Sequence, residues 1–253
     1  MPIGAVCTAA STCMRNLKLT VEFDGARYAG WQYQPRNPTV QGELESAAGK
    51  VLQQKVTVYG CSRTDAGVSA RAYVANLHTG SPLSVERLKL ALNHFLPEDI
   101  LVLSIEEAEP EFHARHSAVG RTYAYRIVRS RSPLRRQHAW EFWFKLDVEK
   151  MRKATPLFVG RKDFQPFCQT RDANGFCTVE SVLVDVDGDE VTVTVRGGRF
   201  LYKMVRRIVG AMVACGSGRL TQRDIRAALA GKHCRPFTTA PAHGLLLDSV
   251  EYQ

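Results

Sequence analysis

The sequence predicts an α+β protein made of two ferredoxin-like (RRM-like) βαββαβ subdomains, which form one continuous antiparallel sheet with a central cleft. Its 253 residues, of which 45% are hydrophobic, provide a core for one large domain or two small ones. Strand-like and helix-like patterns in the first half follow the order β-α-β-β-α-β. The second half repeats that order of elements without repeating the residues, which indicates two subdomains.

The first half contains the clearest patterns. Residues 17–23 alternate strictly between apolar and polar side chains, the period of a half-buried strand. Thr39 and Ser84 each stand directly before a stripe of apolar residues at helical spacing, as N-caps do, and Pro97 ends the second stripe. In chain order the sequence predicts a strand at 17–23, a helix at 40–51, strands at 56–61 and 72–78, a helix at 85–95 and a strand at 100–105.

The second half is predicted from turn and cap signals. Asp187-Gly188-Asp189 separates two alternating runs and predicts a hairpin. Thr221 with Asp224 is a capping box that opens a helix. The predicted elements are strands at 122–128 and 141–146, a helix at 148–157, the hairpin strands at 179–186 and 190–195, a helix at 200–215, the helix after Thr221, and a strand at 245–250. The helix at 200–215 is expected to bury one apolar stripe and to present basic residues on its opposite side.

Three segments are expected along the chain. Residues 1–16 read as a disordered N-terminal extension, residues 17–109 as an N-terminal α/β domain, and residues 110–253 as a C-terminal α/β domain. No linker or low-complexity segment separates the two domains, so they are expected to press together around the cleft.

Positive charge is concentrated in the second half. The net charge is +9, and two stretches without any acid, 112–140 and 191–223, carry seven Lys or Arg each. The rest of the chain is therefore at −5. Thirteen of these fourteen residues are Arg, whose planar fork matches phosphate, so the pattern indicates a nucleic-acid partner, with a solvated basic surface as the alternative.

Composition excludes several other classes of protein. No stretch approaches the roughly 18 apolar residues of a membrane span. Seven cysteines without a C-x-x-C pair argue against a disulfide framework or a zinc ribbon, and the first sixteen residues lack a secretory signal, so a cytoplasmic location is expected. There is no phosphate-cradling Gly-rich loop, and the pair His113 and His116 has no third ligand nearby. The sequence therefore predicts neither a cofactor nor a metal.

One segment stands out as a candidate site. The strand at 56–61 is followed by Arg63-Thr64-Asp65-Ala66-Gly67, which places a carboxylate beside a guanidinium at a turn with a permissive Gly. Taken alone, this pattern is equally typical of an Asx turn with a surface ion pair.

The segment resembles the active-site signature R-T-D-A-G-V of the TruA family of pseudouridine synthases. Further short motifs follow in family order between about residues 17 and 252: Phe23-Asp-Gly-Ala-Arg-Tyr-Ala-Gly-Trp-Gln32, Thr39-Val-Gln41, Leu96-Pro-Glu-Asp-Ile100, Phe112-His-Ala-Arg115, Arg121-Thr-Tyr-Ala-Tyr125, Met204-Val-Arg-Arg-Ile-Val-Gly210 and Gly244-Leu-Leu-Leu247. Many short motifs in order make this resemblance specific.

The resemblance implies an enzyme that isomerises uridine to pseudouridine in tRNA, with the anticodon stem-loop (positions 38 to 40) as the target. The family's essential aspartate falls on Asp65, a carboxylate able to act as nucleophile or base at the sugar. The family needs no metal and no cofactor, and its members are homodimers, so the expected partners are tRNA and a second copy of the chain, with no membrane.

Four other positions match substrate-binding residues of the family. Tyr123 falls on the tyrosine that lies under the flipped uracil, and Arg206 on the arginine that pairs with the aspartate and keeps it ionised. Arg63 matches the basic residue that helps to hold the nucleotide out of the stack, and Leu245 an apolar residue of the uracil pocket. From the basic stretches we also expect Arg129, Arg131, Lys203 and Arg207 to bind RNA along the cleft.

Two residues depart from the family pattern. Ser62 stands where the family usually has Gly, and Ser69 stands where it often has His, which raises the question of loop geometry or substrate choice more than of chemistry. Two alternatives remain open: the same chemistry on another tRNA or RNA uridine, and a non-catalytic RNA-binding protein built on an RRM-like sheet. The sequence contains no aromatic RNP1 pattern, which argues against the non-catalytic RNA-binding protein.

Overall fold

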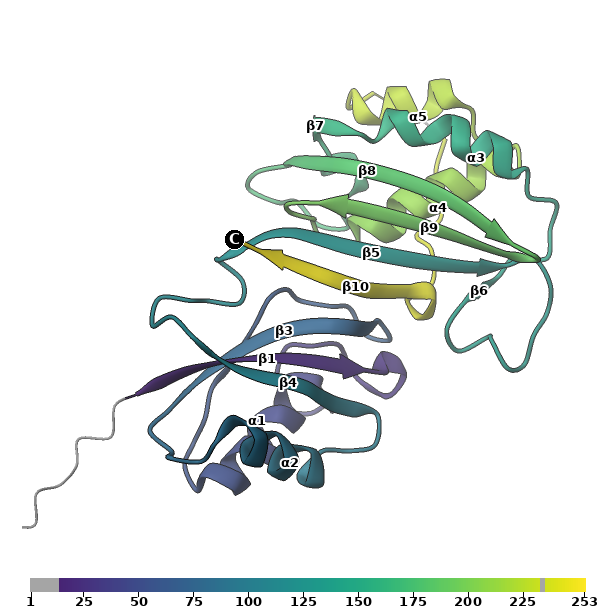
Figure 1. Cartoon of the computed structure of the whole chain (residues 1–253). Coiled ribbons are helices and arrows are strands. Elements are labelled where there is room, and N and C mark those ends of the chain that lie inside the picture. The colour runs from purple at the N-terminus through teal and green to yellow at the C-terminus, as the bar shows by residue number, and fades with distance from the viewer. Residues whose placement is uncertain (1–13, 233–234) are drawn as a thin grey trace, which may run out of the picture.

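The computed structural model describes residues 14–232 and 235–253, and these form a mixed α+β structure around one large sheet (Figure 1). Ten strands belong to the sheet, whose main path runs β4-β1-β3-β10-β5-β9-β8-β7. Most neighbours are antiparallel. The expectation for residues 1–13 lies outside the described residues.

The strands are β1 (Arg15–Phe23), β2 (Val58–Gly60), β3 (Ser69–Thr79), β4 (Ile100–Ala108), β5 (Ala118–Val128), β6 (Trp140–Glu141), β7 (Gly160–Asp163), β8 (Phe176–Asp187), β9 (Glu190–Gly197) and β10 (Leu245–Tyr252). The α-helices are α1 (Val40–Leu52), α2 (Val85–Phe95), α3 (Val148–Ala154), α4 (Met204–Gly216) and α5 (Gln222–Leu229). Short 3-10 turns occupy Gly25–Arg27, Thr155–Leu157, Gln165–Phe167 and Ala242–Gly244. Along residues 14–232 and 235–253, no helix is long and apolar enough to cross a bilayer.

Local sequence signals account for most of these boundaries. In β1 the predicted alternation is confirmed, since Leu17, Leu19 and Val21 are at most 1% exposed. The predicted caps are confirmed as well: the side chains of Thr39 and Ser84 accept backbone N–H groups of α1 and α2. The capping box of Thr221 and Asp224 opens α5.

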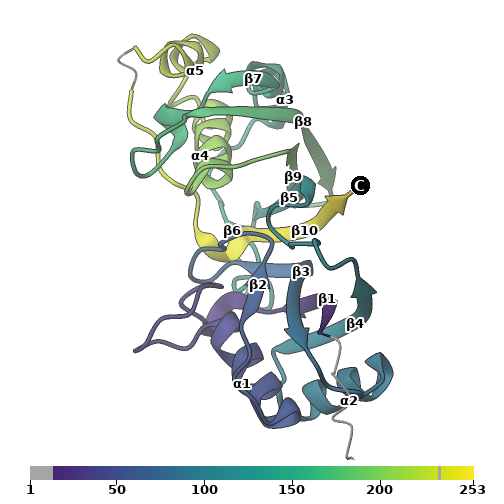
Figure 2. The ribbon, with the colours of Figure 1, turned by 90° about the vertical axis from the view of Figure 1, so that its left-hand side faces the viewer.

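The two halves of the chain share one strand order. In the first half β4 pairs with β1, β1 with β3, and β3 with β2; in the second half the order is β10-β5-β9-β8. Figure 2 shows α1 and α2 beside the first group of strands and α3, α4 and α5 beside the second. A single apolar core includes buried residues of both halves.

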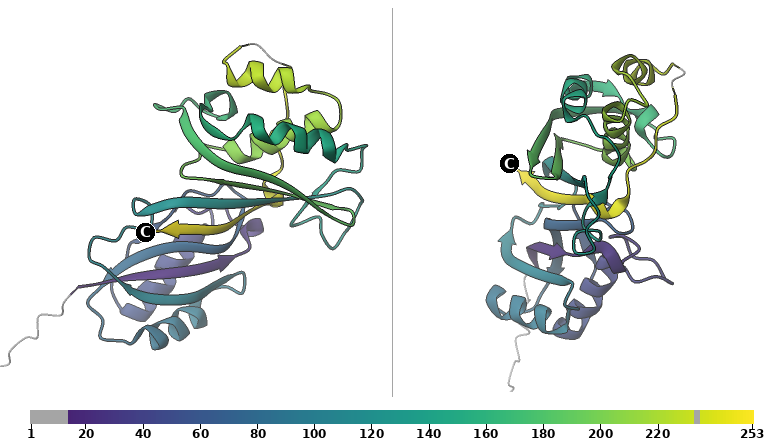
Figure 3. Two further views of the ribbon diagram at one scale, coloured as in Figure 1. Left: turned by 45° about the horizontal axis from the view of Figure 1, so that its top comes forward. Right: turned by 90° about the vertical axis from the view of Figure 1, so that its right-hand side faces the viewer.

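The halves join where β10 pairs with β3, which we call the seam. This pairing is parallel, with Leu246 opposite Ser69 and Leu247 opposite Ala70. The expectation of an entirely antiparallel sheet is therefore wrong at the seam, because the two strands that meet there run in the same direction. The left view in Figure 3 shows β10, in yellow, lying between β3 and β5.

Several predicted boundaries differ from the structure: β5 begins at Ala118 rather than at residue 122, and the helix predicted at 148–157 ends at Ala154. Residues 141–146 do not form a strand: only Trp140–Glu141 pairs with β5, and the chain then leaves the sheet, with Trp143 and Phe144 more than half exposed. The helix predicted at 200–215 begins at Met204, because Lys203 has a left-handed backbone (φ 59°) that interrupts it. β1 also includes Arg15 and Asn16, which had been assigned to the extension, since both pair with β3.

Helix α4 is more buried than its sequence predicts. Every residue from Ile208 to Gly216 is buried, so the helix lacks a polar face over this part. Only Arg206 and Arg207 of its first turns are partly exposed.

Strand β7 was not predicted, because its sequence, Gly-Arg-Lys-Asp, has no apolar alternation.

Candidate active site

The segment from Cys61 to Val68, which we call the motif loop, connects β2 to β3. Tyr73 fixes its start: the Tyr73 hydroxyl donates to the carbonyl of Ser62 and accepts from the Ser62 N–H. The Trp31 ring stacks on the Tyr73 ring at 4.0 Å between centroids, and the backbone N–H of Trp31 donates to the carbonyl of Thr64 (3.3 Å). These contacts fix the backbone of the motif loop at Ser62 and Thr64, just before Asp65.

Close packing against the motif loop requires glycine at position 30. Gly30 has φ +100°, and a Cβ there would lie 2.4 Å from the Thr64 carbonyl oxygen. Gly67, two residues after Asp65, has φ +79°, and its N–H donates to the Tyr28 carbonyl. Both positions use backbone conformations that other residues rarely adopt.

Asp65 and Arg206 meet across the seam. Arg206 Nη1 donates to Asp65 Oδ2 at 2.5 Å, and Arg206 Nε donates to the carbonyl of Ala240 at 2.8 Å. The two side chains are 15% and 13% exposed, so the pair is largely screened from water. A guanidinium with two different acceptors is fixed in orientation, and so is the carboxylate that it contacts.

The segment before β10 completes this arrangement. Ala240 N–H donates to the carbonyl of Arg206, and a Cβ on Gly210 would lie 1.8 Å from the Thr238 carbonyl oxygen. Gly210 therefore allows the segment to pack directly on α4. The sequence analysis missed Ala240, since a backbone acceptor leaves no signal in residue type.

Tyr123 lies in β5, and its side chain is on the same face of the sheet as Leu245 and Leu247 of the neighbouring strand β10. In the antiparallel register Leu245 is opposite Tyr125 and Leu247 is opposite Tyr123, so these side chains share one face of the sheet. Tyr123 and Leu245 are both 7% exposed, and Phe200 packs edge-on against the Tyr123 ring. Burial raises the pKa of Tyr123 to about 12, although the nearby Ser62 hydroxyl and Arg121 charge limit the rise. Its phenol is therefore protonated at neutral pH.

Arg63 is exposed at the edge of the motif loop, and it makes no ion pair within residues 14–232 and 235–253. Its guanidinium is thus available to a ligand near Asp65. Ser69, one of the departures from the family pattern, accepts the Gly25 N–H and donates to Asp24. Ser62 and Ser69 are therefore compatible with an ordered loop.

Arg121 is a further residue that the sequence analysis did not single out. Its side chain is buried, and it donates to the carbonyls of Cys61 (2.8 Å), Gly198 (2.7 Å) and Arg115 (3.3 Å). It thereby connects the start of the motif loop to the C-terminal half. Its signals in the sequence are its place in the motif Arg121-Thr-Tyr-Ala-Tyr125 and in the basic stretch 112–140, neither of which indicates burial.

Fewer basic side chains of the two stretches are available to a ligand than the sequence suggests. Five of their fourteen basic residues pair with carboxylates from other parts of the chain: Arg126 with Glu190, Arg135 with Asp189, Arg196 with Glu251, Arg199 with Asp172, and Arg206 with Asp65. The absence of acids within a stretch says nothing about acids on the neighbouring strands.

The four expected RNA-binding residues lie in two segments, Arg129 and Arg131 after β5, and Lys203 and Arg207 at the start of α4. Arg129 donates to the Gly188 carbonyl at the hairpin turn, and Arg131 lies over the Trp143 ring; both are exposed. Lys203 precedes α4 with its ammonium over Tyr202. Arg207, in the first turns of α4, is partly exposed.

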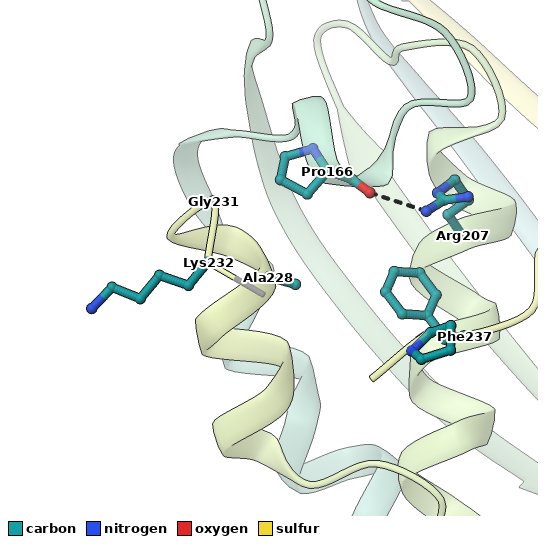
Figure 4. A pocket seen from close by; sticks show the side chains of 7 residues that line it. Pro166, Arg207, Ala228, Gly231, Lys232 and Phe237 are labelled. Atoms are coloured by element: carbon teal, nitrogen blue, oxygen red, sulfur yellow. Dashed lines mark hydrogen bonds between the residues drawn. The ribbon is translucent and has the colours of Figure 1, made fainter. Parts of the chain in front are cut away.

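Arg207 lines a pocket of about 380 Å³ with Pro166, Ala228 and Phe237 (Figure 4). It donates to the Pro166 carbonyl at 3.2 Å and lies 5.0 Å from the centre of the Phe237 ring. Its guanidinium is therefore engaged within the C-terminal half.

The site combines a carboxylate fixed by a guanidinium, a buried phenol and an apolar surface. Such a set can attack or deprotonate a bound ligand and can relay a proton. Within the described ranges, no group of three or more His, Cys, Asp or Glu side chains is arranged to hold a metal ion.

Comparisons with known proteins agree on one family. A family model described as tRNA pseudouridine synthase matches residues 19–117 and 154–253. A protein named tRNA pseudouridine synthase A 2 from Clostridium perfringens is 38% identical over 244 residues, which cover 94% of this chain and 100% of that protein. Proteins named tRNA pseudouridine synthase A from Clostridium acetobutylicum and Hydrogenobaculum sp. are 37% and 38% identical, again over 94% of this chain and 100% of each relative.

Proposed function

The chain belongs to the TruA family of tRNA pseudouridine synthases, and from this premise we propose that it modifies uridines 38 to 40 of the tRNA anticodon stem-loop, with Asp65 as the catalytic carboxylate. The observation that carries this proposal is the contact between Asp65 and Arg206, two residues from different halves, in a site largely shielded from water.

The isomerisation breaks the N1–C1′ bond of uridine and joins the uracil to C1′ through C5. Asp65 acts as nucleophile or base at the sugar, and Arg206 orients it. The proton on C5 must leave and N1 must gain one, so the reaction needs a proton relay, a role that suits the protonated phenol of Tyr123. Leu245 lines the uracil pocket, and Arg63 holds the nucleotide out of the stack.

The shared strand order supports reading each half as a ferredoxin-like unit, the first from Arg15 to about residue 109 and the second over residues 110–253. A homodimer is the proposed assembly, because a 28.2 kDa chain must span a tRNA. Cys61, Cys168, Cys177 and Cys215 are free thiols, in keeping with the proposed cytoplasmic location.

Mapping pseudouridine in tRNA from a strain that lacks this gene, with and without the added protein, tests the function. Restoration at positions 38 to 40 supports the proposal. Restoration at another uridine would support the alternative target, and no restoration at any uridine would contradict the enzymatic role on tRNA.

Replacing Tyr123 by Phe is expected to leave tRNA affinity nearly unchanged and to reduce turnover. The ring keeps its packing against Phe200, whereas the phenolic proton is lost. Single-turnover rates with saturating protein measure the effect. An unchanged rate would show that Tyr123 serves only as a stacking surface.

Replacing Arg129 and Arg131 together by Ala is expected to reduce the salt dependence of tRNA binding. Each phosphate contact contributes about 0.7 to 0.9 to the slope of log K against log salt. Besides Arg207, whose guanidinium donates to Pro166, seven basic residues of the two stretches are partly or fully exposed and form no ion pair within the described residues: Arg115, Arg129, Arg131, Arg136, Lys203, Arg219 and Arg223. The wild-type slope should therefore not exceed about −5 to −6 in magnitude if these stretches supply the contacts. Parallel lines for wild type and double variant would reject a phosphate-binding role for this pair.

A further inference from the structure

A second hollow lies beside the motif loop. It has a volume of about 500 Å³ and is lined by Ala26 and Gly67 from the first half and by Arg136, Gln137, Ala242 and His243 from the second. Gly67 is two residues from Asp65, and Ala242 is two residues from Ala240, the acceptor for Arg206. The hollow, which we call the flanking pocket, therefore adjoins the Asp65–Arg206 pair at the seam.

Arg136 carries the charge of the flanking pocket. It is exposed and makes no ion pair within the described residues, although its neighbour Arg135 is held by Asp189 at 2.7 and 2.8 Å. The acids near this region are Asp24, which contacts His138 at 3.8 Å and accepts the Ala26 N–H, Glu141, which accepts the Ser132 N–H, and Asp65, which is paired with Arg206. The guanidinium of Arg136 is thus free to bind an anion.

The backbone around Arg136 is already ordered. Arg136 N–H donates to the Ser132 carbonyl (3.0 Å), His138 N–H donates to the Arg135 carbonyl (2.9 Å), and Ser132 N–H donates to Glu141 (2.6 Å). Such a segment loses little conformational freedom when it binds a ligand, so the entropic cost of binding is smaller than for a flexible loop.

The other polar groups suit a sugar or a phosphate ester. Gln137 provides both a donor and an acceptor. Burial lowers the pKa of His243, although its hydrogen bond to the Ala139 backbone opposes the shift, and the other ring nitrogen of the neutral imidazole can accept a hydrogen bond. A free guanidinium with two neutral polar side chains matches one phosphate together with its ribose hydroxyl groups.

We propose that the flanking pocket binds the phosphate and ribose next to the target uridine, with Arg136 on the phosphate. This inference rests on the proposed function, because it takes the ligand to be the RNA chain that continues from the uridine at Asp65. It assigns a positioning role to Arg136: the residue holds the backbone while the base is out of the stack.

The test is a double-substitution cycle on binding. The probes are anticodon stem-loop RNAs with a neutral methylphosphonate at one phosphate, placed in turn at each position within two nucleotides of the target. Arg136→Ala should reduce the slope of log K against log salt by about 0.7 to 0.9 with unmodified RNA. One methylphosphonate should produce the same reduction with wild-type protein and no further reduction with Arg136→Ala.

Two controls accompany the cycle. Arg223→Ala removes the same charge from α5, away from the seam (Figure 1), and should leave the methylphosphonate effect intact. Arg136→Lys keeps the charge and should retain the salt slope. If Arg136→Ala behaves like Arg223→Ala, or if every methylphosphonate acts independently of Arg136, the proposal is overturned.

Pseudouridine formation in whole tRNA is measured with the same preparations. A wild-type protein that forms pseudouridine but shows no coupling through Arg136 overturns the flanking pocket alone. A wild-type protein that forms none overturns the proposed function instead, which keeps the two failures distinct.

Discussion

Asp65→Asn is expected to abolish pseudouridine formation while tRNA binding stays close to that of the wild type. The amide has nearly the same shape and can still accept a hydrogen bond from Arg206, but it cannot act as nucleophile or base. The loss should be on the order of a thousandfold or more, as for other catalytic nucleophiles. Single-turnover assays with saturating protein, together with equilibrium binding, separate the two effects.

The matched control is Asp187→Asn, which makes the same change at an exposed hairpin residue far along the chain. This control variant should form pseudouridine at the wild-type rate. If Asp65→Asn also formed product at near wild-type rate, Asp65 would not be the catalytic carboxylate, and the site proposed here would be wrong.

Arg206→Lys is expected to reduce turnover by about ten- to a hundredfold, although the charge is kept. The guanidinium contacts Asp65 and the Ala240 carbonyl with two different nitrogens, whereas an ammonium on a flexible stem cannot hold both in the same geometry. Displacing a catalytic group by about 1 Å can reduce the reaction rate roughly a hundredfold. Turnover at saturating tRNA measures the loss, and thermal unfolding checks that the variant is folded.

Arg207→Lys serves as its control, one residue further along the same helix. Arg207 contacts Pro166 and Phe237 and not Asp65, so this variant should keep its turnover. Equal turnover in Arg206→Lys and the wild type would mean that Arg206 does not orient Asp65.

Most elements could be predicted because their signals are local. The alternation of residues 17–23 and the caps at Thr39, Ser84 and Thr221 depend on neighbours within a few positions, and all lie where the patterns indicated. Residues 141–146 misled the prediction because aromatic residues favour strands, yet Trp143 and Phe144 are exposed in a segment that leaves the sheet.

The candidate site depends on contacts that no local pattern contains. Asp65 and Arg206 are 141 residues apart, and only the family resemblance suggested that they pair. The guanidinium of Arg121 donates to backbone carbonyls, and Ala240 accepts from Arg206 through its own carbonyl, a group that any residue provides. For the same reason the acid-free stretches overstated the free charge, because their partners, such as Glu190 and Glu251, lie on adjacent strands.

The seam between β3 and β10 has a consequence for how the protein is synthesised. β3 leaves the ribosome well over a hundred residues before β10, the strand that covers it. During that time the N-terminal half can fold as a unit, with the start of β3 at Ser69 and Ala70 lacking its β10 partner and Asp65 without its arginine. Unpaired strand edges promote association between chains, so translation that stalls between the two halves should yield an inactive, aggregation-prone fragment rather than a partially active enzyme.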